Sequence, residues 1–342
     1  MAGVMTRRLL PLLAATLLAT AGCVGPLTDT GDSPDVLVTH YPIEFLASEI
    51  AGDDVDVDAF VEGGQPHDFN PGFEDRSALE DASLVVYQGA GFSPGVEGML
   101  ASAGEDGPPS LALVDTVDTI VHEDEHRHEA EENHSNHEDR DGGDQDEHHE
   151  SEHEREHDEH AEGREDPHTW LDPVRMTQHA EAIRDAMQEA FPEHEEAFAN
   201  RTADLVDDLE ALHGDFEAGL ATCEVRTAVV NHNAFAYLGD RYNITFEAAH
   251  GLSPDTEPSA ETIDRLAEIV DHHNLTTVFF EEFVSPEVVE TIADETGADT
   301  EVLSPLAALT DEQRADGETY LTRMRANLHA LEDAMRCTSS GA

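Results

Sequence analysis

Three histidines stand in loops where a metal could be bound. His67 lies after an alternating stretch at residues 55–61, His168 lies within DPHTWLDP, and His232 directly follows the apolar run RTAVVN. In open α/β sheets, ligands bind beyond the carboxyl ends of strands. Imidazole suits Zn²⁺, and three imidazoles with an open fourth position make a competent zinc site. The sequence therefore predicts a metal site formed by His67, His168 and His232.

A second histidine feature, of different character, precedes His168. Ten histidines lie between His122 and His160, and residues 122–166 hold 21 acidic residues. This run has no apolar period and cannot bury a core, so we predict disorder over residues 122–165. It is either a weak collector of zinc or a charged, solubilising insertion. We interpret it as auxiliary, binding metal weakly and without fixed geometry.

The elements around these histidines alternate between strands and helices. Before the run, strands are predicted at residues 36–40, 55–61 and 84–91, with a helix at 42–50. After it, strands are predicted at residues 226–231, 244–249, 276–282 and 300–306, with helices between them. Such alternation predicts parallel sheets with helices on both faces, so the fold class is α/β with two halves.

A helical stretch at residues 174–220 separates the two halves, and Pro192 interrupts it. An apolar stripe follows that break at helical spacing, formed by Phe198, Leu205, Leu209, Leu212, Phe216 and Leu220. A helix of about 28 residues would be roughly 42 Å long, enough to run along both halves as a rigid connector. We therefore place the lobes at residues 35–172 and 222–338 and the connector at 173–221.

The N-terminus has the form of an export signal. Arg7 and Arg8 precede an apolar run at residues 9–19, which is too short to span a bilayer. The paired arginines indicate twin-arginine export, and we predict a signal peptide at residues 1–22. The segment TAGC resembles a lipobox, which predicts lipidation of Cys23 and a tether at residues 23–34; the alternative is ordinary cleavage. The predicted location is extracytoplasmic, anchored by lipid to the outer face of the cell membrane.

The two other cysteines are Cys223 and Cys337. Outside the cell, an even pair of cysteines usually forms a disulfide. Cys223 precedes a predicted strand and Cys337 follows the last predicted helix, so a bridge would tie the chain end to the second lobe. The alternative is two free thiols.

The charge of the chain is strongly negative. The sequence has 77 acidic residues, 17 arginines and no lysine, with a formal net charge of −60. Because residues 122–166 contain only 21 of those acids, 56 lie elsewhere and the whole surface is acidic. Salt screens such charge, so we interpret the composition as adaptation of a halophile to a saline environment. Nucleic acid is excluded as a partner, because phosphate binding needs basic patches.

Residues 36–335 contain the motifs YPIEFLASEIAGD, PHDFNP, LVVYQGAG, DPHTWLDP, NHNAFAYL, GLSPDTEPSA and NLHAL. Together these motifs give the chain a resemblance to one family, the substrate-binding receptors of zinc and manganese ABC importers, zinc-uptake type (cluster A-I). The resemblance implies two pseudo-symmetric α/β lobes bridged by one long rigid helix, with metal held between them by His67, His168 and His232. It also implies delivery of the metal to an ABC permease in the membrane, and we expect a monomer.

The fourth ligand is where this chain departs from the family pattern. Relatives carry an aspartate where this chain has Ser304, and an acid can precede the first histidine where this chain has Gln65 and Pro66. Our candidates for the fourth position are water, then Glu281, then a histidine of the run. His40 is a further candidate, although support of the site or capping of a helix suits it better.

The third imidazole, His232, favours Zn²⁺ over Mn²⁺, since manganese prefers oxygen ligands. A manganese or iron receptor of the same family is the alternative, and so is a zinc-storage or adhesion lipoprotein. Three histidines with an open position could also activate water in an enzyme. No acid or base is clearly paired with them, so we predict that the protein is not an enzyme.

Two residues of DPHTWLDP have predicted roles beside the site. Trp170 is expected to pack against it as a wall. Asp172 either accepts a hydrogen bond from a ligand histidine or caps the following helix.

Overall fold

The computed structural model of the chain describes residues 34–61, 63–122, 163–254 and 257–338. The predicted signal peptide, Cys23 with most of its tether, and residues 123–162 of the histidine run lie outside these ranges. Among the described residues, no helix is both long and apolar enough to cross a membrane.

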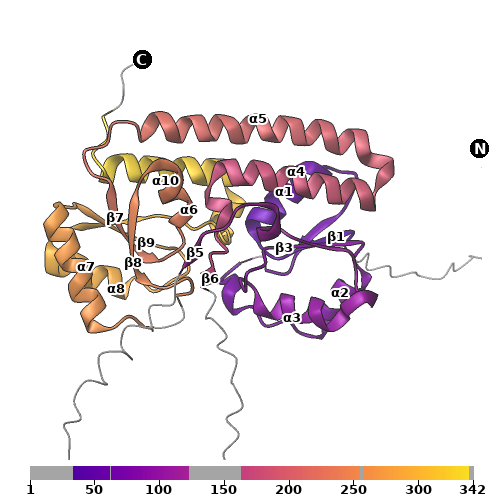
Figure 1. The fold of residues 1–342 in the computed structure, drawn as a ribbon, viewed down its shortest axis with the longest axis horizontal. Helices are drawn as coiled ribbons and strands as arrows, with labels where there is room; N and C mark the ends of the chain where they lie inside the picture. Colours follow the sequence, from indigo (N-terminus) through magenta and orange to yellow (C-terminus); the bar gives the residue numbers. More distant parts are fainter. Residues whose placement is uncertain (1–33, 62, 123–162, 255–256, 339–342) are drawn as a thin grey trace, which may run out of the picture. The chain divides into compact units, whose positions relative to one another are not determined.

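The first lobe is a parallel sheet of four strands with helices on both faces (Figure 1). Its strands are β1 (Val36–Val38), β2 (Val57–Ala59), β3 (Leu84–Tyr87) and β4 (Ser110–Ala112), in the order β2-β1-β3-β4. Its helices are α1 (Tyr41–Ala51), α2 (Phe73–Asp81) and α3 (Pro94–Ala103). Val36 and Val38 join the central core, whereas Leu37 packs in a separate core that includes residues of α2 and α3. This alternation follows from the pleat of a strand buried on both faces.

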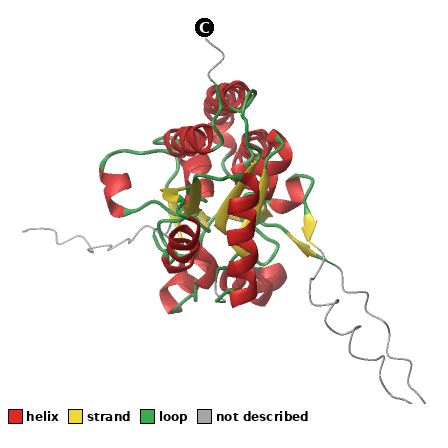
Figure 2. Cartoon of the chain, turned by 90° about the vertical axis from the view of Figure 1, so that its left-hand side faces the viewer, coloured by secondary structure: helices red, strands yellow, loops and turns green. Residues whose placement is uncertain are grey.

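The second lobe repeats the architecture in two strand pairs. β7 (Thr227–His232) pairs in parallel with β8 (Thr245–His250), and β9 (Thr277–Phe280) pairs in parallel with β10 (Asp299–Val302). β7 lies beside β9, so the pairs are neighbours. The helices are α6 (Ala236–Tyr242), α7 (Ala260–His273), α8 (Glu287–Thr296), α9 (Asp311–Ala315) and α10 (Tyr320–Ala334). The predicted two-lobed α/β fold is confirmed, and Figure 2 shows the strands lying among the surrounding helices.

Two helices form the connector between the lobes. α4 (Pro173–Ala190) begins where the Asp172 side chain accepts a hydrogen bond from the backbone N–H of Val174, with Pro173 in the first turn. A short 3₁₀ turn at Pro192–His194 separates α4 from α5 (Glu195–Gly219). α5 packs against α1 of the first lobe and α10 of the second, and it runs along the top of both lobes in Figure 1. Its apolar stripe is buried, at Phe198, Leu205, Leu209, Leu212 and Phe216.

The predicted disorder over residues 122–165 is wrong at both edges. β5 (Val121–His122) pairs antiparallel with β6 (Arg164–Glu165), which closes the base of the insertion as a short hairpin. The hairpin is held to the second lobe, because the Tyr237 hydroxyl accepts a hydrogen bond from the Ile120 N–H and donates one to the Asp166 carbonyl. Tertiary contacts therefore order two ends whose composition alone indicates disorder.

A disulfide joins Cys223 to Cys337, 114 residues apart, and so ties the turn after α5 to the chain just beyond α10.

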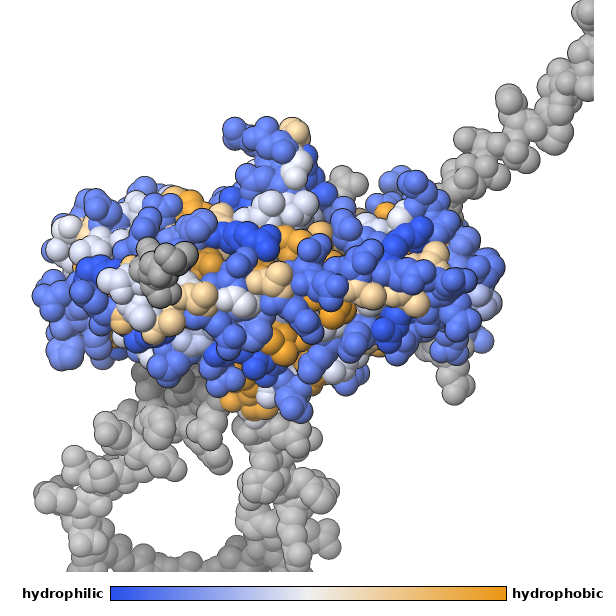
Figure 3. Space-filling model, turned by 90° about the horizontal axis from the view of Figure 1, so that it is seen from above, coloured by the Kyte–Doolittle hydropathy of each residue, from blue (hydrophilic) through white to orange (hydrophobic). Residues whose placement is uncertain are grey.

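The face that carries α5 is mostly hydrophilic (Figure 3). Among the described residues, Phe73 and Val121 are the large apolar side chains that are exposed.

Candidate metal centre

The three predicted histidines converge between the lobes. His67 lies in the 3₁₀ turn η1 (Pro66–Asp68) after β2, His168 directly precedes the 3₁₀ turn η6 (Thr169–Leu171), and His232 ends β7. One ring nitrogen of each lies within 4.8 Å of the others. The side chains of His168 and His232 are almost fully buried, and that of His67 is half-buried. This places three imidazole donors around one point.

A buried carboxylate holds His168. Both the ring Nδ1 and the backbone N–H of His168 lie against Oδ1 of Asp166, at 2.8 and 2.9 Å. An ionised carboxylate only accepts, so Nδ1 carries the proton and Nε2 keeps its lone pair. Burial opposes ionisation of Asp166, but hydrogen bonds from His122 and His168 outweigh it and lower its pKa to about 2. Asp166 therefore stays an acceptor and fixes the His168 tautomer.

The second lobe uses the same arrangement for His232. Oε1 of Glu281, one residue beyond β9, accepts from Nδ1 of His232 at 2.6 Å and from its backbone N–H at 3.2 Å. Nε2 of His232 then faces Nε2 of His168 at 3.4 Å. With both protons on Nδ1, two lone pairs point at one another, an arrangement that a cation between or beside them would relieve.

His67 completes the cluster from the first lobe. Its ring packs edge-on against Phe92, with centroids 4.4 Å apart, and lies 5.5 Å from the ring of His168. Burial, followed by the nearby charges of His168 and His232, lowers its pKa to about 2. Burial also lowers the pKa of His168 in spite of its bond to Asp166. Both rings are therefore neutral at ordinary pH and can donate lone pairs to a metal.

An aromatic wall lies behind the donors. The ring of Trp170 is 5.2 Å from that of His168, and its Nε1 donates to the Pro305 carbonyl of the other lobe at 2.7 Å. His40 is fully buried between Phe92 and Trp170. Its Nδ1 meets the Thr39 hydroxyl, and its side chain makes no capping hydrogen bond to α1, so the capping role suggested for it is wrong.

The Asp172 side chain caps helix α4 and makes no hydrogen bond to His67, His168 or His232 among the described contacts. Besides capping α4, it accepts hydrogen bonds from Arg175 and, through both oxygens, from Arg241. Asp166, which our sequence analysis did not single out, is the carboxylate that holds a histidine. The available signal was a second aspartate in the same motif, two residues before His168.

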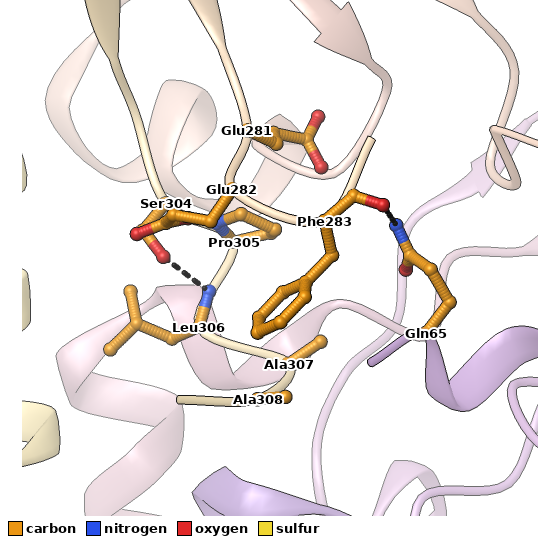
Figure 4. Close-up of a pocket in the computed structure, with 9 residues that line it drawn as sticks. All are labelled: Gln65, Glu281, Glu282, Phe283, Ser304, Pro305, Leu306, Ala307 and Ala308. Carbon is orange, nitrogen blue, oxygen red and sulfur yellow. Dashed lines mark hydrogen bonds between the residues drawn. The ribbon is translucent and has the colours of Figure 1, made fainter. Parts of the chain in front are cut away.

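A small cavity lies beside Glu281, where residues of both lobes meet. Glu281 and Ser304 line this cavity, and Gln65 reaches it from the first lobe to donate to the Phe283 carbonyl at 3.2 Å (Figure 4). Ser304 is buried, its N–H donating to the Asn327 side chain and its hydroxyl accepting from the Leu306 N–H. Glu281, predicted as a possible ligand, directs Oε1 to the Nδ1 side of His232, away from Nε2.

Two α/β lobes joined by a helical connector, with a cluster of donors between them, define the class of bilobal binding proteins. Within that class, this chain belongs to the family described as zinc-uptake complex component A, periplasmic (ZnuA), whose model matches residues 36–334.

Individual relatives agree with this assignment. The chain is 33% identical over 303 residues to the zinc-binding protein AdcA of Streptococcus pyogenes, covering 86% of this chain and 55% of AdcA. It is 30% identical over 330 residues to the high-affinity zinc uptake system protein ZnuA of Bacillus subtilis, covering 95% and 96% of the two chains. The Zn(II)-bound ZnuA-like domain of Streptococcus pneumoniae AdcA matches with a TM-score of 0.67 and 27% identity, over 89% of this chain and 99% of that domain. The chain thus spans about half the length of AdcA.

Proposed function

We propose that this protein is an extracytoplasmic receptor that captures Zn²⁺ between its lobes and delivers it to an ABC permease for high-affinity import. The observation that carries the proposal is the convergence of His67, His168 and His232, whose ring nitrogens lie within 4.8 Å of one another. The zinc-binding and zinc-uptake names of the relatives support it. A receptor needs a site that closes around its ligand and opens again, and a site assembled from two lobes meets that need.

The donor set favours zinc among divalent metals. Three neutral imidazoles suit Zn²⁺, whereas Mn²⁺ prefers carboxylate and carbonyl oxygens. In direct competition, the isolated protein should therefore bind Zn²⁺ more tightly than Mn²⁺. Tighter binding of Mn²⁺ would move the assignment to the alternative, a manganese receptor of the same family.

Water takes the fourth position in this proposal, and Glu281 is a positioning residue. Its Oε1 is engaged by Nδ1 and the backbone N–H of His232, on the side of the ring away from the other imidazoles. Asp166 stands in the same relation to His168, so Asp166→Asn is the matched comparison for Glu281→Gln. Similar losses of zinc affinity in the two variants support positioning; a far larger loss in Glu281→Gln would make Glu281 a ligand.

The location follows from the N-terminus. Export through a signal peptide at residues 1–22 and lipidation of Cys23 would hold the receptor at the outer face of the membrane, next to its permease. The word lipoprotein in the name of the pneumococcal relative supports the anchor. Mass spectrometry of the membrane fraction tests it, since a lipidated Cys23 at the mature N-terminus is the expected product.

The test of function is zinc binding to mature protein that lacks residues 123–162, in high salt, with a competing chelator. We expect one tight Zn²⁺ per chain, lost on His168→Ala. In the full chain measured beside it, the chelator removes metal that the histidine run binds weakly. No tight zinc in the shortened parent, with tight zinc in the full chain, would move the function to the run and favour zinc storage.

A further inference from the structure

One histidine of the run lies within the described structure and contacts the metal centre indirectly. His122 is the first residue of the run and sits in β5. Its Nε2 is 3.0 Å from Oδ2 of Asp166, the carboxylate whose Oδ1 holds His168. The His122 side chain is 30% exposed, whereas the Asp166 side chain is fully buried. A continuous chain of hydrogen bonds therefore runs from solvent through Asp166 to a candidate ligand.

We propose that His122 is an outer positioning residue of the zinc site, which acts by holding the Asp166 carboxylate in the orientation that fixes His168. This inference rests on the proposed function, because it assumes that His168 binds the metal. It also separates His122 from the remainder of the run, which our sequence analysis treated as one auxiliary segment.

The backbone around Asp166 is already fixed without His122. The Asp166 N–H donates to the Ile120 carbonyl at 2.8 Å, and its carbonyl accepts from the Tyr237 hydroxyl at 2.7 Å. What these bonds leave free is rotation of the carboxylate about its side-chain torsions. His168 and His122 each engage one of its oxygens, and together they remove that freedom.

Losing His122 would leave Oδ2 buried without its imidazole partner. A buried, hydrogen-bonded charge that loses one partner is strongly disfavoured, unlike an exposed ion pair, which contributes little. The carboxylate would then rotate toward solvent or draw in water, and Oδ1 would leave its position against both N–H groups of His168. The ring of His168 would gain freedom, and the metal site would lose part of its preorganisation.

The strand pairing explains why His122 is held in place for this role. His122 is in register with Arg164 across the β5–β6 pair, and Asp166 follows that pair by one residue. The hairpin thus brings the first residue of the insertion next to the carboxylate just after its end. A deletion that begins at residue 122 would remove this contact, whereas one spanning 123–162 keeps it.

The experiment compares full-length mature variants by zinc affinity under chelator competition, with the absorption spectrum of bound Co²⁺ as a reporter of ligand geometry. We expect His122→Ala to weaken zinc binding about 10-fold, the lower end for residues behind the ligands, and to alter the Co²⁺ spectrum. His122→Gln should recover both, since its amide nitrogen can donate at the place of Nε2. The control is His329→Ala, which removes an exposed histidine bonded to Glu332 on α10 and should change neither.

A double-mutant cycle shows whether His122 acts through Asp166. If it does, His122→Ala combined with Asp166→Asn loses no more affinity than Asp166→Asn alone. Additive losses would overturn the inference, as would a His122→Ala variant that binds like the parent. Should His122→Ala fail to fold by circular dichroism, His122→Asn replaces it, because its shorter side chain falls short of Asp166. A parent without tight zinc would overturn the proposed function itself, a separate result.

Discussion

At the scale of single residues, the site depends on how each imidazole is held. A free histidine ring rotates and exchanges its proton between two nitrogens. Tight metal binding needs one ring orientation and one tautomer. Asp166 and Glu281 freeze them alike, each accepting from Nδ1 and from the backbone N–H of the same histidine. Two acceptor bonds to one residue fix the ring and its tautomer together. The candidate ligands are thereby ordered during folding, so that a metal would not have to order them on binding.

Asp166→Asn provides a direct check of this account. The amide is a weaker acceptor than a carboxylate and is free to present its NH₂ group, so the hold on His168 is weakened. We expect zinc affinity to fall about 10- to 100-fold, measured by chelator competition. The matched control is Asp172→Asn, from the same motif and equally buried, which contacts Arg175 and Arg241. That variant should lose stability and keep its zinc affinity; equal losses of affinity in both would contradict the role of Asp166.

A second residue, His179, makes stability depend on pH. It is fully buried, with Nδ1 against the Thr116 hydroxyl at 3.0 Å and Nε2 against the Thr169 hydroxyl at 2.8 Å. Burial, aided by the charge of Arg175, lowers its pKa from 6.5 to about 3. The unfolded chain therefore binds a proton between those pH values that the folded chain does not. The contribution of neutral His179 to the free energy of unfolding is fully present above about pH 6.5. It is lost as pH falls toward 3, by ~1.4 kcal/mol per pH unit between those values.

Urea unfolding of metal-free protein between pH 4 and 7 measures this slope. His179→Gln should flatten it by about one proton, because the amide does not titrate. An unchanged slope in this variant would show that His179 is protonated in the folded state or shielded from titration in the unfolded chain.

At the scale of elements, α5 packs against both lobes and so supports them on one helix. Leu209 lies in its buried stripe with no exposed surface, while the next residue, Glu210, is exposed. We expect Leu209→Ala to lower the free energy of unfolding by about 2–5 kcal/mol through lost burial and the cavity left behind. Glu210→Ala should change it by less than about 0.5 kcal/mol. Zinc affinity of the folded Leu209→Ala protein should equal that of the parent, since α5 supports the lobes and does not touch the donors.

The sequence predicts the larger elements of the fold better than the residues that surround the site. Alternating strands and helices predict the two lobes, and the position of His232 directly after a strand predicts its place at a carboxyl edge. The residues that hold the candidate ligands are harder to predict from the sequence, because Asp166 and Asp172 flank His168 in one motif and only tertiary packing shows which of them contacts it. His122 is harder still: its composition groups it with the run for which the sequence predicts disorder, while a two-residue strand pairing orders it. Such short pairings leave no periodic signal.

At the scale of the whole molecule, contacts between the lobes surround the donors. The Trp170 indole donates to Pro305, the Tyr320 hydroxyl donates to the Trp170 carbonyl, and Gln65 donates to Phe283. These are single hydrogen bonds between neutral groups, each contributing about 1 kcal/mol.

Apolar and ionic contacts also join the lobes. The ring of Phe45 on α1 stacks on that of Tyr320 on α10, Arg314 on α9 pairs with Glu44 on α1, and the central core includes residues of both lobes. Separation of the lobes would therefore have to break these contacts as well.

The charge of the whole molecule leads to a prediction about salt. With a formal net charge of −60, the folded chain repels itself more than the extended chain does. Raising ionic strength from about 0.1 to 1 M shortens the Debye length from ~10 to ~3 Å and screens that repulsion. We therefore expect the thermal midpoint of metal-free protein, kept in chelator, to rise over this range and to rise equally in NaCl and KCl.

A matched variant locates the effect on the surface of the folded domain. Asp207, Asp208 and Glu210 lie exposed on α5, and replacing them with Asn, Asn and Gln removes three negative charges at nearly constant shape. This triple variant should be more stable than the parent at low salt and should gain less from added salt. If parent and variant respond alike, the salt dependence arises elsewhere, and the histidine run is the next segment to neutralise. A thermal midpoint that falls with salt would contradict the interpretation of the acidic composition as adaptation to a saline environment.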